Sequence, residues 1–156
     1  KPIRIKLMKT FTTFLLLLIS VNLLSQEHVN LKKGYAADGY DVVTYFSNEA
    51  IEGNKEFQTV YQGIKYKFSS SENLSEFNKN PKIYVPQYGG FCAYAIAEKG
   101  EEVGVNPKTF QIIDNKLYLF YNAWGVNTLE KWNEEGVDAL QRKADDNWKS
   151  IVKKGG

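Results

Sequence analysis

Residues 81–97, near the middle of the chain, restrict the backbone more than any other stretch. They contain two of the four prolines, a Gly-Gly pair and the only cysteine. Proline disfavours helix in the residue before it, so this stretch is predicted to run extended over residues 82–87. The pair Gly89 and Gly90 then permits a sharp turn. From there small and large apolar residues alternate with no charge before Glu98, which predicts a helix buried on most of its faces.

Residues 1–25 resemble an export signal. A basic start is followed by an uncharged, leucine-rich run that is short for a membrane span. We therefore predict an exported protein, secreted or periplasmic, with cleavage after Ser25 and a single domain over residues 26–156. The first methionine is Met8, so residues 1–7 could lie upstream of the true start. The alternative is a retained N-terminal membrane anchor, and in either case only the leader is expected to meet a membrane.

The leader accounts for the basic charge of the full chain. It carries 4 of the 20 Lys and Arg residues and none of the 18 Asp and Glu residues, which leaves residues 26–156 with a net charge of −2. Because this part has no basic patch, nucleic acid is not an expected partner. Cys92 has no second cysteine with which to form an intramolecular disulfide, so burial must stabilise the domain in an oxidising compartment.

Two hairpins are predicted from short apolar runs joined by turn residues. The first turns at Gln62-Gly63, and its second strand alternates apolar with polar residues, as a strand with one buried face does. The second turns at Asp114-Asn115, a two-residue connection that favours a tight hairpin. The predicted strands are residues 57–61 and 64–68 in the first hairpin, and residues 110–113 and 116–121 in the second.

Helices are predicted on both sides of the central stretch. The capping-box spacing from Ser69 to Glu72 predicts a helix that ends near Asn80, and a second capping spacing begins at Asn127. The last helix should close the domain over the sheet, because its apolar residues recur at helical spacing. These residues are Val137, Leu140, Ala144, Trp148, Ile151 and Val152. The predicted fold class is therefore α+β: a small antiparallel sheet built from two hairpins, packed with a central buried helix and a C-terminal amphipathic helix.

Three features near the start of the domain are open to more than one interpretation. Residues 41–46 could form a helical turn or a strand, because the run is too short to decide. Asp41 could serve a ligand, but a capping role in that turn is preferred. His28, the only histidine, is interpreted as a solvated residue of a polar lead-in.

Six short motifs, taken together, carry a resemblance to a known family. They lie at residues 39–46, 66–73, 77–81, 84–93, 116–119 and 144–148. In this order, and over nearly the whole chain after the leader, they are similar to the exported, single-domain branch of the YHS-domain family. The resemblance implies a small α+β domain. It also implies a link with metal handling, because other branches sit beside heavy-metal transporters or carry cysteines in the segment after the aromatic strand.

The segment that corresponds to the cysteine-bearing one departs from the family. Residues 68–73 place serine and asparagine where sulfur ligands would stand, and the histidine of the family's name is missing there. A tetrahedral zinc or copper site needs several sulfur or imidazole ligands, whereas the chain past residue 28 offers Cys92 and no histidine. We therefore predict that the domain does not hold zinc or copper tightly. The sequence identifies neither another metal nor a cofactor.

The favoured hypothesis is a non-catalytic binding module for an unidentified small molecule or ion. The Gly89-Gly90 turn and the start of the following helix would form the pocket, because exposed backbone N–H groups suit an anionic or polar ligand. The alternative is that the two glycines simply allow close packing. The candidate ligand-binding residues are Tyr84, Tyr88, Gly89, Gly90, Cys92, Asn122 and Trp124.

The second hypothesis is a thiol-based redox or catalytic protein that acts through Cys92. The dipole of a helix that begins at Gly90 would favour the reactive thiolate. No histidine is available as its base unless His28 folds back, and a buried, inert thiol among alanines is the preferred interpretation. We therefore do not expect an enzyme, and the sequence indicates neither the oligomeric state nor a protein partner.

Overall fold

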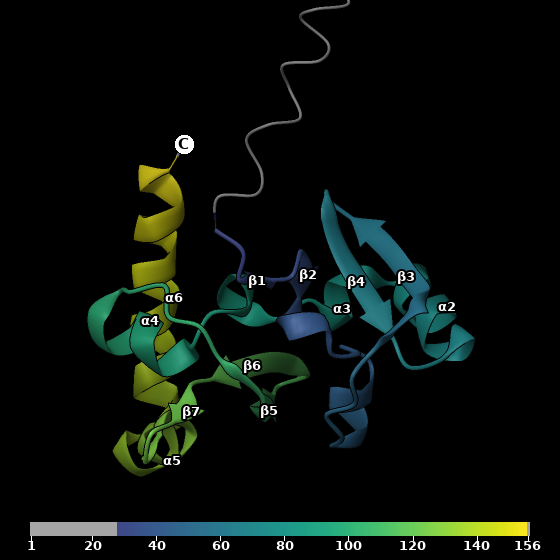
Figure 1. The fold of residues 1–156 in the computed structure, drawn as a ribbon. Helices are drawn as coiled ribbons and strands as arrows, with labels where there is room; N and C mark the ends of the chain where they lie inside the picture. The colour runs from purple at the N-terminus through teal and green to yellow at the C-terminus, as the bar shows by residue number, and fades with distance from the viewer. Residues whose placement is uncertain (1–27, 156) are drawn as a thin grey trace, which may run out of the picture.

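The computed structural model describes residues 28–155, and the predicted α+β class is confirmed. The predicted leader and its cleavage site after Ser25 lie outside the described residues. The strand-rich first part of the domain lies on one side, and the helices of the second part lie on the other (Figure 1). Within residues 28–155, no helix has the length and apolar character needed to cross a bilayer.

The first sheet has four strands in the order β1-β2-β4-β3. The strands are β1 (Leu31–Lys32), β2 (Tyr35–Ala36), β3 (Asn54–Tyr61) and β4 (Ile64–Phe68). The predicted first hairpin, β3 and β4, is confirmed, and Gln62 and Gly63 both adopt the positive φ that a tight hairpin turn of the mirror-image type requires. β2 lies parallel to β4, so the sheet is mixed.

The second predicted hairpin is also confirmed, and it forms a sheet of its own. It pairs β5 (Asn106–Ile113) with β6 (Lys116–Phe120) across a turn in which Asp114 and Asn115 both have positive φ. The two hairpins thus lie in separate sheets, where one shared sheet was expected. β4 is paired on both edges, by β3 and β2, and β5 and β6 form a two-stranded sheet of their own. A third, very short hairpin pairs β7 (Asn122–Ala123) with β8 (Val126–Asn127).

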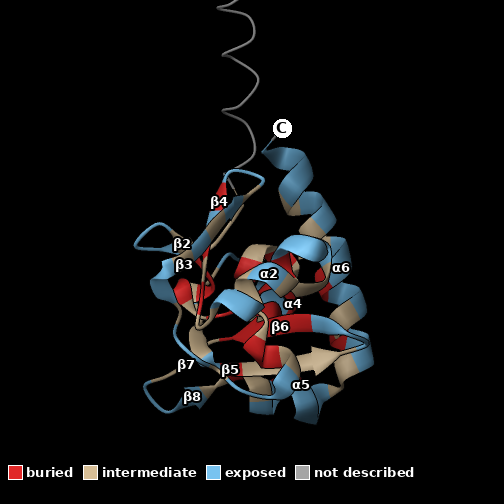
Figure 2. Cartoon of the chain, turned by 90° about the vertical axis from the view of Figure 1, so that its right-hand side faces the viewer, coloured by how far each residue is buried: buried red, intermediate tan, exposed pale blue. Residues whose placement is uncertain are grey.

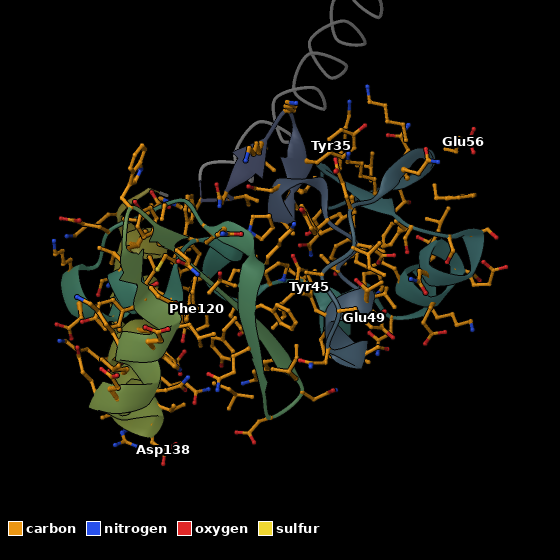
Figure 3. The ribbon with its side chains drawn as sticks, turned by 60° about the horizontal axis from the view of Figure 1, so that its bottom comes forward. Tyr35, Tyr45, Glu49, Glu56, Phe120 and Asp138 are labelled. Carbon is orange, nitrogen blue, oxygen red and sulfur yellow. The ribbon has the colours of Figure 1, made fainter. Side chains whose placement is uncertain are left out.

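β6 separates two hydrophobic cores. Leu117 and Leu119 belong to the first core and Tyr118 and Phe120 to the second, because successive side chains of a strand point to opposite faces. All four are buried, and Figure 2 shows the buried residues gathered along β4 and β6. In Figure 3, Tyr45 lies inside the first core and Phe120 inside the second. The remaining buried members of the first core are Ala36, Ala37, Val42, Tyr45, Ile64, Tyr66, Phe68 and Phe77. Those of the second core are Tyr88, Ala93, Ile96, Ala97, Trp132, Leu140 and Ala144.

The loop between β2 and β3 contains two short 3₁₀ turns, Ala37–Gly39 and Thr44–Ser47. The helical alternative for residues 41–46 is therefore correct. Asp41 precedes the second turn, and its Oδ1 accepts a hydrogen bond from the N–H of Val43 at 2.9 Å. Asp41 thus fixes the turn that leads into the 3₁₀ segment, but Val43 occupies the capping position and its side chain makes no capping hydrogen bond.

The helix predicted after the first hairpin is α2 (Ser71–Lys79). It begins one residue later than the predicted spacing, because Ser70 is the capping residue. The Ser70 hydroxyl accepts a hydrogen bond from the N–H of Asn73 at 3.1 Å. The helix ends at Asn80, just before Pro81, as predicted.

The next segment does not run extended over residues 82–87, so that prediction is wrong. It begins instead with a single helical turn, α3 (Pro81–Tyr84). Pro81 occupies the first helical position, where a missing N–H removes no intrahelical hydrogen bond. The restriction before a proline acts only on Val85, which is extended.

The central buried helix is α4 (Ala93–Lys99), and it begins three residues later than predicted. Gly90, where the helix was expected to begin, has a positive φ, and Phe91 after it is extended, so a right-handed helix cannot include these residues. Cys92 is therefore the residue before the helix and not part of its first turn.

α5 (Thr128–Glu135) follows the cap predicted at Asn127. The side chain of Asn127 accepts a hydrogen bond from the N–H of Leu129 at 3.2 Å. Trp132, one turn further along α5, is fully buried in the second core.

α6 (Val137–Lys154) is the predicted C-terminal amphipathic helix. It lies alongside α4 (Figure 1), and its Leu140 and Ala144 share the second core with Tyr118 and Phe120 of β6. Asn147 joins the two helices, because its side-chain amide donates to the carbonyl oxygens of Ile96 and Ala97 at 2.9 and 3.0 Å. Val152, assigned to the buried face by its spacing, is 47% exposed.

Candidate functional site

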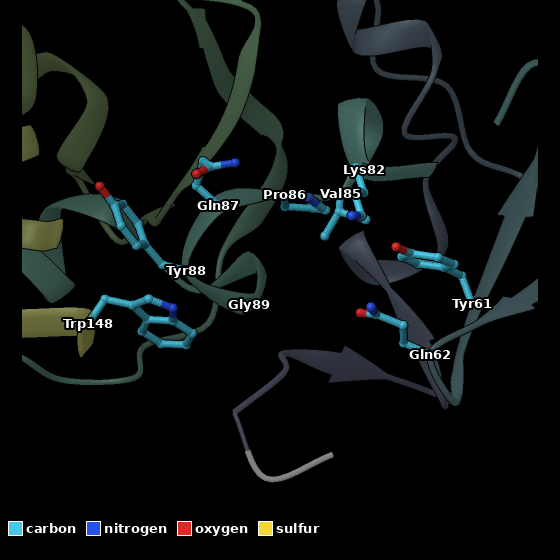
Figure 4. Close-up of a pocket in the computed structure, with 9 residues that line it drawn as sticks. All are labelled: Tyr61, Gln62, Lys82, Val85, Pro86, Gln87, Tyr88, Gly89 and Trp148. Carbon is cyan, nitrogen blue, oxygen red and sulfur yellow. The ribbon is translucent and has the colours of Figure 1, made fainter. Parts of the chain in front are cut away.

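An open pocket of about 320 Å³ lies where the two cores meet. We call it the aromatic pocket. It is lined by Tyr61 and Gln62 from the β3–β4 turn, by several residues between Lys82 and Gly89, and by Trp148 of α6. Figure 4 shows the β3–β4 turn on one side of the pocket, and Tyr88 and Trp148 on the other. The pocket therefore depends on three segments that are distant in the sequence.

Two other surface hollows are larger. One, of about 430 Å³, lies over a single face of α2. The other, of about 340 Å³, contains Lys32 and Asp38, which form an ion pair at 2.9 Å and so neutralise each other's charge. The aromatic pocket brings together side chains from both cores, and it is the candidate site.

Tyr88 and Trp148 form the aromatic side of the pocket. Their ring centroids are 6.1 Å apart at an angle of 63°. The Tyr88 hydroxyl donates a hydrogen bond to Asp145 at 2.8 Å. Burial, followed by this hydrogen bond, raises the pKa of Tyr88 above its ordinary value. The Tyr88 hydroxyl therefore stays protonated, and its ring keeps a fixed orientation in the wall of the pocket.

Lys82 and Tyr61 form the polar side of the pocket (Figure 4). Lys82 is the only charged residue among those that line it. Within residues 28–155, neither the Lys82 ammonium nor the Tyr61 hydroxyl has a hydrogen-bond or ion-pair partner. Both groups can donate hydrogen bonds to a ligand.

Residues 28–33, which we call the N-terminal strap, lie across the Gly89-Gly90 turn. The N–H of Asn30 donates to the Gly89 carbonyl at 2.9 Å, and its side-chain amide donates to the Gly90 carbonyl at 3.1 Å. A Cβ on Gly89 would lie 2.0 Å from the carbonyl oxygen of His28. The glycine pair is thus needed for close packing, which is the alternative that the sequence left open.

His28 is part of this strap, so its interpretation as a solvated residue is wrong. Its Nδ1 lies 2.7 Å from a carboxylate oxygen of Glu102, and its side chain is only 24% exposed. Its ring meets the Trp148 ring edge-on, with 6.2 Å between centroids. The histidine does fold back onto the domain, but toward the aromatic pocket and not toward Cys92.

Cys92 is fully buried and held by two neutral groups. Its sulfur accepts a hydrogen bond from the N–H of Tyr121 at 3.3 Å and lies 3.3 Å from the hydroxyl of Thr128. That hydroxyl donates its own proton to the Tyr121 carbonyl at 2.7 Å, so the thiol is the donor in the Cys92–Thr128 pair. This geometry favours the inert thiol and does not favour a reactive one.

The residues at which the sequence placed the start of the helix do not offer free N–H groups. The N–H of Phe91 donates to the Tyr88 carbonyl at 3.0 Å, and that of Cys92 donates to the Val103 carbonyl at 2.9 Å. Both donors are therefore already used within the protein. An anion bound by the N–H groups of these two residues is not supported.

The seven sequence candidates do not gather in one place. Only Tyr88 and Gly89 line the aromatic pocket. Tyr84 packs against Phe77 in the first core, and its hydroxyl donates to Glu76 at 3.2 Å. Gly90 and Cys92 are buried.

Asn122 and Trp124 lie in the short β7–β8 hairpin. Asn122 donates to the Thr109 hydroxyl at 3.1 Å, so its amide serves the hairpin's own packing. Trp124 occupies the hairpin turn and is 95% exposed. Neither residue lines the aromatic pocket.

Sequence reasoning missed most of the pocket lining. Tyr61 and Gln62 were read only as part of a hairpin, and Trp148 only as part of a helix face. Local pattern offers no signal that a hairpin turn and a C-terminal helix lie on opposite sides of one pocket. Lys82 could have been selected from the sequence, because it lies in the same proline-bounded stretch as Tyr88.

Residues 68–73, where the resemblance led us to look for sulfur ligands, have a structural role in this chain. Asp41 is fully buried, and its Oδ2 accepts hydrogen bonds from the Ser69 N–H at 2.8 Å, the Ser69 hydroxyl at 2.7 Å and the Asn73 amide at 2.8 Å. Serine and asparagine thus satisfy a buried carboxylate here. Within residues 28–155, no three or more His, Cys, Asp and Glu side chains gather in a group that could hold a metal ion.

Comparison with known proteins identifies part of the chain. No curated protein and no solved structure matches it. The family model of the YHS domain matches residues 48–88, which include β3, β4, α2 and α3. Every residue that lines the aromatic pocket falls in this range except Gly89 and Trp148. The chain therefore contains a YHS domain over residues 48–88.

Proposed function

We propose that this YHS-domain protein is a non-catalytic binding module and that a small ligand binds in the aromatic pocket. One observation carries the proposal: the YHS segment supplies nearly all of the pocket's lining, and α6 completes it with Trp148. Small-ligand sites are typically concave, mainly apolar and aromatic, with a few polar groups that orient the ligand. The aromatic pocket is concave and combines aromatic rings with polar groups, and the polar part of its lining is the larger.

The lining favours binding over catalysis. The aromatic pocket presents tyrosines, a tryptophan, glutamines, apolar residues and Lys82, without a nucleophile next to a base. The two groups that a thiol mechanism would need are apart: Cys92 is enclosed by Tyr121 and Thr128, and His28 contacts Glu102 and Trp148.

The cellular setting is part of the same proposal. The basic, leucine-rich leader supports export to the periplasm or to the outside of the cell, with cleavage after Ser25. N-terminal sequencing of the cell-derived protein tests this step. A start near Gln26 is expected, and recovery of the intact leader in the membrane fraction would contradict export as a free protein.

Native mass spectrometry of the protein purified from its own compartment tests the binding function. We expect a mass above that of the polypeptide, and loss of the extra mass in Trp148→Leu. Trp124→Leu is the matched control, because Trp124 is exposed and lies away from the aromatic pocket. Circular dichroism would show that both variants are folded. An extra mass that survives Trp148→Leu, or no extra mass in any form, would overturn the proposal.

A further inference from the structure

The aromatic pocket is polar at one end and apolar at the other. Lys82 and Tyr61 stand at one end, and Tyr88 and Trp148 at the other, with Val85 and Pro86 between them (Figure 4). A ligand that satisfies both ends must itself be amphipathic. The spatial order of the lining residues thus restricts the chemistry of the ligand.

The polar end presents hydrogen-bond donors and one positive charge. The Lys82 ammonium and the Tyr61 hydroxyl have no partner among residues 28–155, as described above. No carboxylate lines the aromatic pocket, so nothing in its lining opposes a negative charge on the ligand. An anionic group such as a carboxylate accepts hydrogen bonds from both donors and pairs with the ammonium.

The other end suits a flat, apolar body. Trp148 is half-buried and offers the ring on which a planar group can stack, whereas the Tyr88 ring, which is only 5% exposed, packs against Trp148 at 63° and supports it. The Tyr88 hydroxyl is occupied by Asp145, which leaves the ring as its contribution to the aromatic pocket. The volume of about 320 Å³ suits a ligand of one or two rings.

We infer that the aromatic pocket takes a small planar organic anion, with its acidic group at Lys82 and Tyr61 and its rings at Tyr88 and Trp148. This inference rests on the proposed binding function and specifies the class of ligand.

Three matched probes test the charge of the ligand: 2-naphthoate, its neutral amide 2-naphthamide, and the cation 2-naphthylmethylammonium. Binding is followed by the NMR shifts of the Gly89 amide and the Trp148 indole N–H. We expect naphthoate to bind about fivefold more tightly than naphthamide, because an exposed ion pair contributes up to about 1 kcal/mol. The cation should bind most weakly, and added salt should weaken only the binding of naphthoate.

Variants separate the two ends. Lys82→Gln should remove the preference for naphthoate over naphthamide, whereas Lys108→Gln, at an exposed position on β5, should leave it unchanged. Trp148→Leu should weaken the binding of both probes.

Equal affinity for the acid and the amide, or an acid preference that survives Lys82→Gln, would overturn the ligand class while leaving the binding function intact. Absence of any shift at Gly89 and Trp148 with all three probes would also overturn it. The proposed binding function itself is contradicted only by the native mass spectrometry experiment described above.

Discussion

The two cores of the domain are built in different ways. The first packs β3, β4 and α2 around a cluster of aromatic rings and contains the buried carboxylate of Asp41. The second packs α4, α5 and α6 against β6, and charged side chains are absent from its buried residues. The YHS match covers β3, β4 and α2 of the first core and ends at Tyr88, a buried residue of the second. The difference teaches that a pocket can form at the edge of a recognised segment, from parts that the segment alone does not contain.

The shared strand β6 should make the two cores unfold together. Its side chains belong alternately to both cores, so neither core can lose β6 without exposing the other. The three tryptophans, Trp124, Trp132 and Trp148, all belong to the second part of the chain. Tryptophan fluorescence therefore reports on the second core and can reveal whether damage to the first core reaches it.

The largest expected effect comes from removing the centre of the first core. Phe77 is fully buried and packs against Tyr66 and Phe68, with ring centroids 4.9 and 5.0 Å away. Phe77→Ala should lower the free energy of unfolding by about 3–5 kcal/mol. The loss should appear equally in urea titrations followed by tryptophan fluorescence and by circular dichroism. Two separate transitions would show that β6 does not couple the cores.

The second largest effect is expected from the buried carboxylate of Asp41, which has no counterpart in the second core. Asp41→Asn replaces an oxygen that accepts hydrogen bonds with an amide that faces the same donors, from Ser69 and Asn73. We expect a loss of about 3 kcal/mol in unfolding free energy, because hydrogen bonds to a buried charge are strong. Asp146→Asn, at an exposed position on α6, is the control and should change stability by less than about 0.5 kcal/mol. A similar effect of the two variants would refute a special role for Asp41.

High pH should weaken the first core through Tyr66. Burial, followed by the nearby Tyr61, raises the pKa of Tyr66 to about 12, whereas a tyrosine in an unfolded chain titrates near about 10. The folded state holds this proton more tightly, so the stabilisation is complete below pH 10 and is lost as the pH rises toward 12. The full loss should be about 2–3 kcal/mol above pH 12, and about half of it should be present at pH 11.

Urea titrations at pH 8, 10 and 11 measure this loss of stability. Tyr66→Phe is the control, because this variant lacks the part of the loss that is due to ionisation of Tyr66. If Tyr66→Phe loses as much stability at high pH as the unaltered protein does, the effect comes from other groups. Absorbance at 295 nm follows the ionisation of the tyrosines directly.

The next effect concerns the contact between the strap and the pocket wall. Gly89→Ala should cost about 2 kcal/mol, because it adds the strain of a positive φ to a clash with the His28 carbonyl. Gly125→Ala has the strain without the clash and should cost about 1 kcal/mol. Hydrogen exchange of the Asn30 amide should rise sharply only in Gly89→Ala. Equal exchange in the two variants would show that the strap does not depend on Gly89.

The smallest effect is expected at Cys92. Cys92→Ala should cost about 1 kcal/mol, because a small buried group and its weak hydrogen bonds are lost. Binding in the aromatic pocket should be unchanged. A thiol reagent should label the native protein far more slowly than the protein in denaturant. Rapid native labelling would revive the thiol-based hypothesis.

Local chemistry explains which parts of the fold could be predicted. The turns at Gln62-Gly63 and Asp114-Asn115 and the cap at Asn127 each depend on a few adjacent residues, and all three occur as expected. The errors lie where a distant contact decides. Asn30 of the strap is hydrogen-bonded to Gly89 and Gly90, which form a turn of positive φ where α4 was expected to begin. The parallel pairing of β2 with β4 adds strands to the first sheet that no hairpin pattern indicates.

The candidate site was predictable only in part for the same reason. Tyr88 and Gly89 stand in the most restricted stretch of the sequence, which is why they could be selected. Tyr61 and Trp148 meet them only through the packing of the two cores. Trp124 was selected for its aromatic character, but the β7–β8 turn carries it into solvent.

The N-terminal strap has a consequence for the order in which the chain folds. Asn30 bonds to Gly90, 60 positions further along, and β2 joins β4 in parallel, a pairing that no local hairpin can start. Contacts of such long sequence separation form late, because a large loop must close first. During synthesis the residues made first would therefore be the last to dock. The amino end of the domain would remain free until residue 90 and the segments around it are in place.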